Sequence, residues 1–535
     1  MSCHCKTFQP PGEFQSLFPA RDVELFSLLR NNINSSDVAA STLISTAKDD
    51  LDRCRKILRA FEDEHMRMEG IIYSLKNQEK ALERVYKNAT SLESPIRKVS
   101  PEILQTIFAA VDVTNIIPHD ERGSWGMEAM HIAGVCRHWR KVALSTKQLW
   151  CNIVFRPCGN PDHHPPMVRV LQKVLSLSGR LPLTISYGGG ALSAPLTALL
   201  CAESDRWCSV STTTIGLLLQ MVDHSKLRHL ELQPMKAVPI FPSGVTDIVL
   251  KGIRNPNQHI LWSRYYSPQP SILHLDMHEL PLSCVLRLAK HCPALLSLAV
   301  DDCYLDTIAN DLSSVRISTL ETLVLNSCTV GTVAKLFSSL TLPQLNSISI
   351  RDLYTDGTDS RQRTYATLFP VMDLGQMLAR EMSTPKSLSM SGVILSRSRL
   401  ESVLKLFPSL ESLTFCENSD DAGANSPVLD NLLNRMNPSV QLSAATTLVP
   451  KLRYLKLDVR GLLFSSRTFV DMVRARWNLS TTSGRTSLNL KTLVLHAPRK
   501  FFEGDDLRAL RVLHRAGMQI LFRAGKTWID LDAEE

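Results

Sequence analysis

The sequence predicts an α/β protein in three parts: a long N-terminal helix, a small all-α unit, and a right-handed α/β solenoid whose parallel strands line a concave face. Three observations lead to this prediction. A heptad pattern runs through residues 46–90, and two short amphipathic segments lie within residues 94–155. A short apolar pattern returns between Leu227 and Leu495, within residues 181–523 that are expected to form the solenoid. Self-similarity of this kind is typical of repeat proteins, in which each unit buries its apolar side chains against its neighbours.

The composition provides ample apolar residues for a core and excludes several classes of protein. Of the 535 residues, 44% are hydrophobic and 21% charged, and the formal net charge is +8. No basic block is long enough to predict a nucleic-acid partner. The longest apolar runs fall short of the ~20 residues that cross a bilayer, so no membrane segment is expected. The thirteen scattered cysteines, and an N-terminus without the apolar core of a signal peptide, predict free thiols and a cytoplasmic or nuclear location.

Residues 1–45 are expected to form a flexible arm, and residues 46–90 a long helix. Thr46 and Asp49 have the spacing of a capping box at the start of this helix. A seam then recurs at alternating steps of three and four residues: Leu51, Cys54, Leu58, Phe61, His65, Met68, Ile72, Leu75, Glu79, Leu82 and Tyr86. At ~1.5 Å per residue the helix is roughly 60 Å long, too long for a small domain to cover. The sequence leaves open whether residues 47–89 form a homodimer or pack against the chain's own repeats.

The segment 94–155 predicts two short helices. Ser100 can cap the first helix, Pro101 suits its first position, and Glu102 lies near the positive end of its dipole. The second helix is expected over residues 131–145. Residues 112–130 between them are expected to form a polar spacer.

This segment resembles the F-box family, whose motif of about 45 residues opens with Leu-Pro-x-Glu and closes with Val-Cys-Arg-x-Trp and Leu-Trp. The matching residues are Val99, Ser100, Pro101, Glu102, Ile103, Leu104, Ile107, Phe108, Val135, Cys136, Arg137, Trp139, Arg140, Leu149 and Trp150. The layout with a preceding long helix is similar to that of F-box proteins of mushroom-forming fungi. The chain departs from the family in its Val-Ser opening and in its longer spacer.

The resemblance implies that the segment docks on a Skp-type adaptor of an SCF-type cullin-RING ubiquitin ligase, while the remaining chain recruits a protein substrate. The residues implied in adaptor binding are Val99, Pro101, Glu102, Ile103, Leu104, Ile107, Phe108, Val135, Cys136, Trp139, Leu149 and Trp150. A unit of about 60 residues also buries too little apolar surface to be stable alone, which favours a partner. The alternative is that these helices only cap the repeats that follow.

After a linker and a first helix over residues 156–180, the pattern apolar-x-x-apolar-x-apolar returns with the 20 to 29-residue period of leucine-rich repeats. Its apolar positions are Leu227, Leu230 and Leu232; Val245, Ile248 and Leu250; Ile272, Leu275 and Met277; Leu295, Leu298 and Val300; Leu320, Leu323 and Leu325; Leu345, Ile348 and Ile350; Leu410, Leu413 and Phe415; Leu452, Leu455 and Leu457; and Leu490, Leu493 and Leu495, with a degenerate copy at Leu388 and Met390. Each copy predicts a strand. Helices are expected between strands, as in residues 283–295, 332–345 and 398–410.

Three polar residues fit the turn that leaves the strand in such repeats: Cys303, Cys328 and Asn418. They are therefore expected to be structural. Residues 354–385 and 417–447 are expected to be loops, and residues 524–535 an acidic tail after the solenoid. Outward strand positions are the candidates for substrate contact: Arg228, Glu231, His274, Asp276, Arg453, Tyr454 and Lys456.

No signature of a phosphate loop, nucleophile elbow or metalloprotease is present, so no catalytic, metal or cofactor site is expected. The leading hypothesis is a substrate-receptor subunit of an SCF-type ligase. The alternative hypothesis is a leucine-rich-repeat scaffold without a ligase role, assembled through the N-terminal helix.

Overall fold

The computed structural model of the chain divides into two compact units, Met1–Ile103 and Leu104–Glu535. It describes Arg30 and residues 38–117, 126–156, 164–188, 194–212, 225–233, 241–252, 268–306, 314–355, 368–393, 395, 397–416, 427–440, 447–459, 465–482, 490–497, 502, 504–525 and 527–532. The boundary between the two units falls inside a helix that spans Pro101–Ala110.

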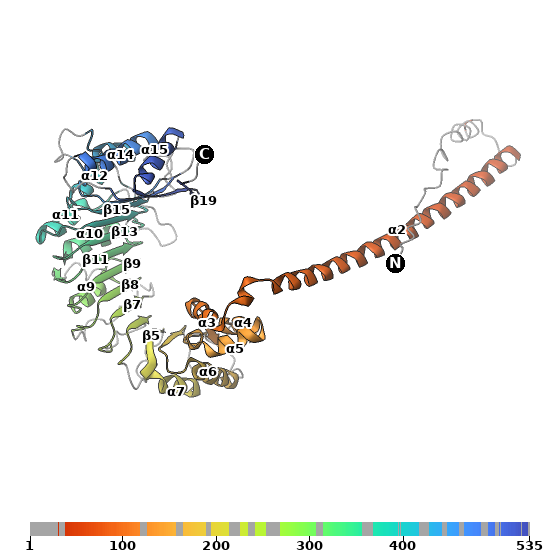
Figure 1. The fold of residues 1–535 in the computed structure, drawn as a ribbon, viewed down its shortest axis with the longest axis horizontal. Coiled ribbons are helices and arrows are strands. Elements are labelled where there is room, and N and C mark those ends of the chain that lie inside the picture. The colour runs from red at the N-terminus through yellow and green to blue at the C-terminus, as the bar shows by residue number, and fades with distance from the viewer. Residues whose placement is uncertain are drawn as a thin grey trace. The chain divides into compact units, whose positions relative to one another are not determined.

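The first unit is dominated by the helix α2, Val38–Leu92 (Figure 1). The helix begins before Thr46, so the prediction of a capping box at Thr46 and Asp49 is wrong. Thr46 lies within the helix, and its hydroxyl donates to the carbonyl oxygen of Thr42 at 2.9 Å, the back-bonding that satisfies a threonine inside a helix. Residues 38–45 of the predicted arm are thus helical, and residues 1–29 and 31–37 lie outside the described residues. A short 3-10 helix, Pro95–Lys98, follows α2.

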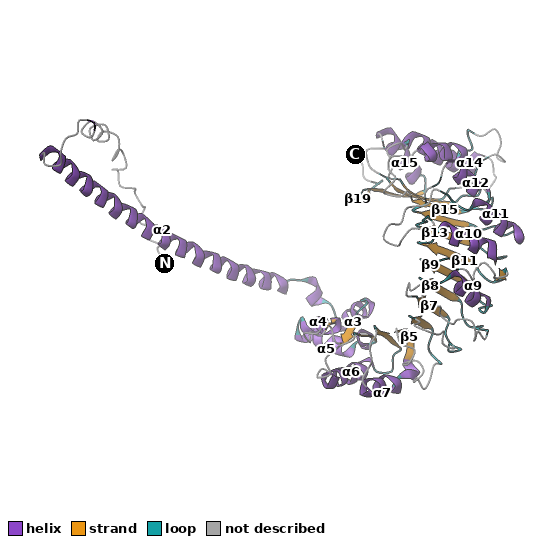
Figure 2. Ribbon diagram, turned by 180° about the vertical axis from the view of Figure 1, so that it is seen from behind, coloured by secondary structure: helices purple, strands orange, loops and turns teal. Residues whose placement is uncertain are grey.

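The second unit is built on one long sheet of short strands (Figure 2). The strands are β1 Asn115–Ile117, β2 Gly126–Met127, β3 Asn152–Phe155, β4 Leu183–Tyr187, β5 Trp207–Thr212, β6 His229–Leu232, β7 Asp247–Lys251, β8 His274–His278, β9 Ser297–Asp301, β11 Thr322–Asn326, β13 Ser347–Arg351, β14 Ser387–Ser391, β15 Ser412–Cys416, β16 Tyr454–Asp458, β17 Thr492–His496, β18 Gln519–Ala524 and β19 Thr527–Ile529. A separate small pair consists of β10 Val315–Arg316 and β12 Leu340–Thr341.

From β3 to β18 each strand of the long sheet pairs in parallel with the next along the chain. The predicted repeats fall into register across this sheet, because one buried row runs through their second apolar positions: Leu230, Ile248, Leu275, Leu298, Leu323, Ile348, Leu388, Leu413, Leu455 and Leu493. The prediction of an α/β fold with stacked parallel strands is confirmed.

Helices cover one face of the sheet, so that the strands line the inner side of the curved second unit (Figure 1). They are α6 His164–Ser178, α7 Ala194–Ala202, α9 Leu282–Lys290, α10 Val330–Ser339, α11 Val371–Arg380, α12 Arg397–Lys405, α13 Pro427–Met436, α14 Ser466–Thr482 and α15 Gly504–Arg515. Three further helices, α3 Pro101–Ala110, α4 Glu128–Gly134 and α5 Arg137–Ser145, precede β3 along the chain. Two short 3-10 helices are Lys147–Trp150 and Ser204–Arg206.

Two segments predicted to be loops contain helices of the solenoid. Within residues 354–385 lies α11, and within residues 417–447 lies α13. Both segments are polar on average, but each carries one apolar face that packs into the core. The buried side chains are Leu374, Met377 and Leu378 in α11, and Leu432, Leu433 and Met436 in α13. The prediction failed because it relied on the average polarity of each segment and not on the helical spacing of its few apolar residues.

A left-handed residue follows the strand in five successive repeats. These residues are Glu279, Asp302, Ser327, Asp352 and Gly392, with φ between 50° and 63°. The next residue turns inward and is buried. It is cysteine in two repeats: the Cys303 thiol donates to the carbonyl oxygen of Met277 at 3.3 Å, and the Cys328 thiol to that of Asn326 at 3.1 Å. Their predicted structural role is confirmed, while Asn418 lies outside the described residues.

The sheet extends beyond the predicted solenoid at both ends. The prediction that residues 94–155 form an all-α unit is wrong, since β1 within the predicted spacer pairs in parallel with β3. Buried Asn115 fastens this end, because its amide donates to the carbonyl oxygens of Leu149 at 2.8 Å and Asn152 at 3.1 Å. At the other end the predicted tail contains β19, which pairs antiparallel with β18. Residues 118–125 of the spacer lie outside the described residues.

Candidate docking surfaces

The start of α3 follows the prediction from its sequence. The helix begins at Pro101, and the hydroxyl oxygen of Ser100 accepts a hydrogen bond from the backbone N–H of Ile103 at 3.5 Å. A hydrogen bond from the backbone N–H of Glu102 itself, and one with Ser100, lower the pKa of the Glu102 carboxyl. A charged Glu102 therefore remains at the positive end of the helix dipole.

Four of the residues implied in adaptor binding form the interior of the helical segment. Leu104, Phe108, Leu149 and Trp150 are each at most 2% exposed. The indole N–H of Trp150 donates to the carbonyl oxygen of Ala143 at 3.0 Å, which satisfies its one polar group. These side chains hold the segment together and are closed to a partner in this structure.

Val135 and Cys136 determine where the backbone turns between two short helices. In place of the single predicted helix over residues 131–145, the chain forms α4 and α5, which are separated at Val135 and Cys136. Cys136 is extended, with φ −160° and ψ 173°, and its sulfur accepts a hydrogen bond from the backbone N–H of Trp139 at 3.4 Å. The cysteine thus caps α5. The helix prediction was wrong here because hydrophobic spacing alone does not reveal a cap between two short helices.

Trp139 joins α5 to α3. Its ring meets that of Phe108 edge to face with centroids 5.0 Å apart, and Trp139 is only half-buried. Beside this contact the Gln105 amide donates to the Ser145 hydroxyl at 3.0 Å. The two aromatic rings and this polar contact fix α3 on α5.

The outer side of α3 carries an apolar stripe, which we call the α3 stripe: Ile103, Ile107 and Val111, exposed by 56%, 41% and 48%. These residues recur at steps of four, so they share one side of the helix and its continuation. Val135, between α4 and α5, is 60% exposed. Val99 is half-buried, whereas Pro101 and Glu102 are exposed. The residues implied in adaptor binding therefore divide into an interior set and an outward set.

The second surface is the sheet face opposite the helices, which we call the open face. Five of the seven predicted substrate residues lie in its outward rows: Glu231, His274, Asp276, Tyr454 and Lys456. They do not form one site. Six strand spacings of ~4.8 Å separate β8 from β16, a distance of about 29 Å along the sheet.

The other two predicted substrate residues, Arg228 and Arg453, each precede a strand and lie at the edge of the sheet. The guanidinium of Arg228 donates to the carbonyl oxygen of Gly244 at 2.8 Å, and that of Arg453 lies 3.9 Å from the Glu411 carboxylate. Arg228 thus supports a neighbouring turn. Their placement corrects the expectation that both arginines occupy outward strand positions.

The open face changes character along the sheet. The strands β6 to β9 carry Glu231, Asp247, Asp276 and Asp301, with Lys251 paired to Glu231. Burial works to raise the pKa of Glu231, but the hydrogen bond and charge of Lys251 lower it overall. The strands β13 to β15 instead present small hydroxyl side chains: Ser347, Ser349, Ser387, Ser389, Ser391, Ser412 and Thr414.

One cluster on this face was not predicted. The two ring nitrogens of His278 lie 3.1 Å from the Asp276 carboxylate and 3.0 Å from that of Asp301. The hydrogen bond with Asp276, together with the charge of Asp301, raises the pKa of His278 despite its partial burial. The signal was present in the sequence, because His278 and Asp301 occupy the third outward position of successive repeats.

No group of three or more His, Cys, Asp or Glu side chains in the described part of the chain has a geometry that could hold a metal ion. Among the described helices, none combines the length and the apolar character that crossing a bilayer needs. No protein-family model matches the chain, and no curated protein matches it.

Proposed function

We propose that this chain is the substrate-receptor subunit of an SCF-type cullin-RING ubiquitin ligase. In this proposal the helical segment within residues 94–155 docks on a Skp-type adaptor, and the open face of the solenoid binds a protein substrate. The observation that carries the proposal is the α3 stripe. It exposes apolar side chains on a helix whose other side is fully buried, inside a segment with an F-box-like order of residues.

The division of the motif into two sets supports a docking role. Packing in the interior accounts for the apolar character of Leu104, Phe108, Leu149 and Trp150. It does not account for Ile103, Ile107 and Val135, which contribute little to the described core. Exposed apolar side chains at consecutive turns of a helix are typical of a surface that another protein covers. The adaptor would gain apolar contact there without unfolding the segment.

The solenoid supports the receptor part of the proposal. A row of parallel strands presents outward side chains in fixed register, which suits recognition of an extended protein surface. The contrast between its carboxylate-rich part on β6 to β9 and its hydroxyl-rich part on β13 to β15 offers two chemically different contact areas. We propose that the substrate spans both.

Co-purification with a Skp-type adaptor tests the docking proposal. The variant combines Ile107→Asp with Val135→Asp, and the control combines Met372→Asp with Val512→Asp, two exposed apolar residues on solenoid helices. We expect the first variant to lose at least 90% of the recovered adaptor and the control to retain it, with melting temperatures unchanged. Equal recovery of wild type and the first variant would contradict the proposal.

A leucine-rich-repeat scaffold without a ligase role is the second candidate. The observation in its favour is α2, a 55-residue helix with exposed apolar side chains. The two candidates differ in the adaptor experiment, because a scaffold does not need the α3 stripe to be occupied by an adaptor.

A further inference from the structure

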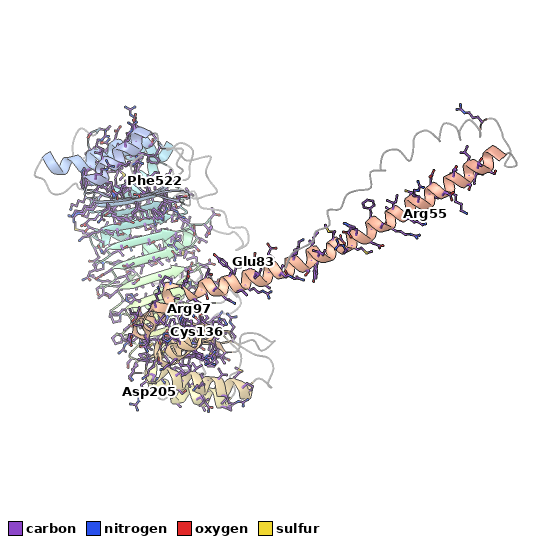
Figure 3. All side chains as sticks on the ribbon, turned by 45° about the vertical axis from the view of Figure 1, so that its right-hand side comes forward. Arg55, Glu83, Arg97, Cys136, Asp205 and Phe522 are labelled. Carbon is purple, nitrogen blue, oxygen red and sulfur yellow. The ribbon has the colours of Figure 1, made fainter. Side chains whose placement is uncertain are left out.

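The long helix α2 carries an apolar stripe that its own unit does not bury. Its seam residues Leu51, Leu58, Met68, Ile72, Leu75 and Leu82 are each between 48% and 67% exposed. In Figure 3 side chains project from α2 along its length, those of Arg55 and Glu83 among them. No described side chain of the helix is buried. Apolar side chains at heptad spacing over about five repeats require a covering surface.

A second copy of α2 fits this stripe in length. From Leu51 to Tyr86 the seam covers 36 residues of sequence, or about 54 Å of helix at ~1.5 Å per residue. The longest helix described in the second unit, α14, has 17 residues and covers less than half of that length. The charges are also compatible, since residues 38–92 carry ten basic and nine acidic side chains, a net charge of +1.

We propose that two copies of the chain associate through α2 as an antiparallel helical pair centred near Gly70 and Ile71. In this arrangement each residue of one of the two alternating sets of seam positions lies opposite a residue of the other set in the second copy. Leu58 lies opposite Leu82 of the second copy, and Ile72 opposite Met68. The proposal does not rest on adaptor docking.

The charges of the helix favour the antiparallel arrangement over the parallel one. Residues 62–69 are acidic: Glu62, Asp63, Glu64 and Glu69, with only Arg67 to offset them. A parallel pair in register would place this block against itself and Glu79 against its own copy. In the antiparallel pair the block faces residues 71–78, whose only charge is Lys76, and Glu79 faces Phe61. Only Glu69, beside the centre of the pair, then lies near its own copy.

The residues beside the seam select the register. Ile57, Ile71 and Val85 each directly precede a seam position that they flank. With the centre near Ile71, Ile71 meets its own copy and Ile57 lies beside Val85 of the second copy. A shift by one heptad in one direction aligns the acidic block with itself. A shift in the other direction places Ile71 beside Gln78.

Light scattering on the full chain tests the association. We expect twice the mass of one chain for wild type and a single-chain mass for Leu58→Asp combined with Leu82→Asp. The matched control combines Met66→Asp with Tyr73→Asp, which are 63% and 70% exposed and lie off the seam, so the same two helix-disfavouring residues are introduced. The control should keep the double mass. A single-chain mass for wild type, or loss of association in the control, would overturn the proposal.

Disulfide mapping tests the direction of the helices. In the antiparallel pair the native Cys54 lies opposite Tyr86 of the second copy, whereas a parallel pair brings the two Cys54 side chains together. Mild oxidation of Tyr86→Cys should therefore link Cys54 to the introduced thiol of the other copy, as identified by peptide mass mapping. The control Tyr73→Cys, off the seam, should give no link to Cys54. Disulfides between the two Cys54 residues would contradict the antiparallel arrangement.

Discussion

The helices α2 and α9 show opposite ways in which a helix is stabilised in this protein. In the nine-residue α9, seven side chains are buried, including polar Ser283 and Cys284. In the 55-residue α2 no described side chain is buried. An isolated helix as short as α9 is unstable in water, so α9 depends on its neighbouring repeats. The length and heptad seam of α2 allow it to depend on another chain instead. The same substitution should therefore have different effects in the two regions.

The largest difference in stability between the solenoid and α2 is expected when an arginine is replaced by alanine. Arg476 in α14 is 1% exposed and donates to the carbonyl oxygens of Met436, Leu448 and Val449 at 2.7 to 3.1 Å. Burial lowers the pKa of its guanidinium to about 10. Arg476→Ala leaves three buried carbonyls without donors and opens a cavity, so we expect the free energy of unfolding to fall by ~4 kcal/mol.

The control for this prediction lies in α2. Arg67 pairs with Glu64 at 2.6 and 2.7 Å, but the side chains are 62% and 35% exposed. Arg67→Ala should leave the unfolding of the solenoid in urea unchanged. A loss for Arg476→Ala no larger than that for Arg67→Ala would show that the buried arginine is not a structural anchor.

A smaller difference in stability is expected when a leucine is replaced by alanine in the two regions. Leu298 in β9 is fully buried between two neighbouring strands, and Leu298→Ala should lower the free energy of unfolding by ~3 kcal/mol. Leu58 in α2 is 55% exposed, and Leu58→Ala should leave the solenoid transition within ~0.5 kcal/mol of wild type. Urea unfolding followed by the buried tryptophans measures both. Equal effects would contradict the expectation that Leu58 does not stabilise the solenoid.

Substitution of glycine by alanine should have opposite effects on stability in the two regions. Gly392 has φ +63°, and an added Cβ would clash with a carboxylate oxygen of Asp352, so Gly392→Ala should destabilise the solenoid by ~2 kcal/mol. Around Gly70 in α2 no atom lies within 4 Å of an added Cβ, so Gly70→Ala should stabilise the helix by ~1 kcal/mol. Thermal unfolding monitored by circular dichroism checks both. A destabilising Gly70→Ala would show that α2 packs closely at this residue.

The smallest effect concerns pH. Since the pKa of His278 is raised by Asp276 and Asp301, its stabilisation is complete below the unfolded pKa of ~6.5 and is lost as the pH rises through the folded value. His278→Gln should therefore destabilise the solenoid by ~0.5 kcal/mol more at pH 6 than at pH 9. His274→Gln, 51% exposed and 4.0 Å from Asp247, is the control. A larger loss of stability at pH 9 than at pH 6 would contradict the stabilising role of protonated His278.

The sequence predicted the repeats well because their signal is local. Residues such as Leu298 and Leu323 share a spacing that specifies both burial and register, and the structure confirms it. Position within the motif could not separate Leu104 from Ile103, since both are apolar neighbours on α3 and only tertiary packing decides which faces inward. The join of β1 to β3 was missed for a related reason. It pairs residues far apart in sequence, which no local pattern reveals.

Adaptor docking through the α3 stripe is the central claim, and hydrogen exchange tests it most directly. Amide exchange of the full chain would be measured with and without a saturating Skp-type adaptor. We predict slower exchange in α3 and around Val135 in the complex, with the strands β6 to β18 unchanged. Adaptor binding that leaves α3 unprotected, or protection confined to the solenoid, would contradict the account.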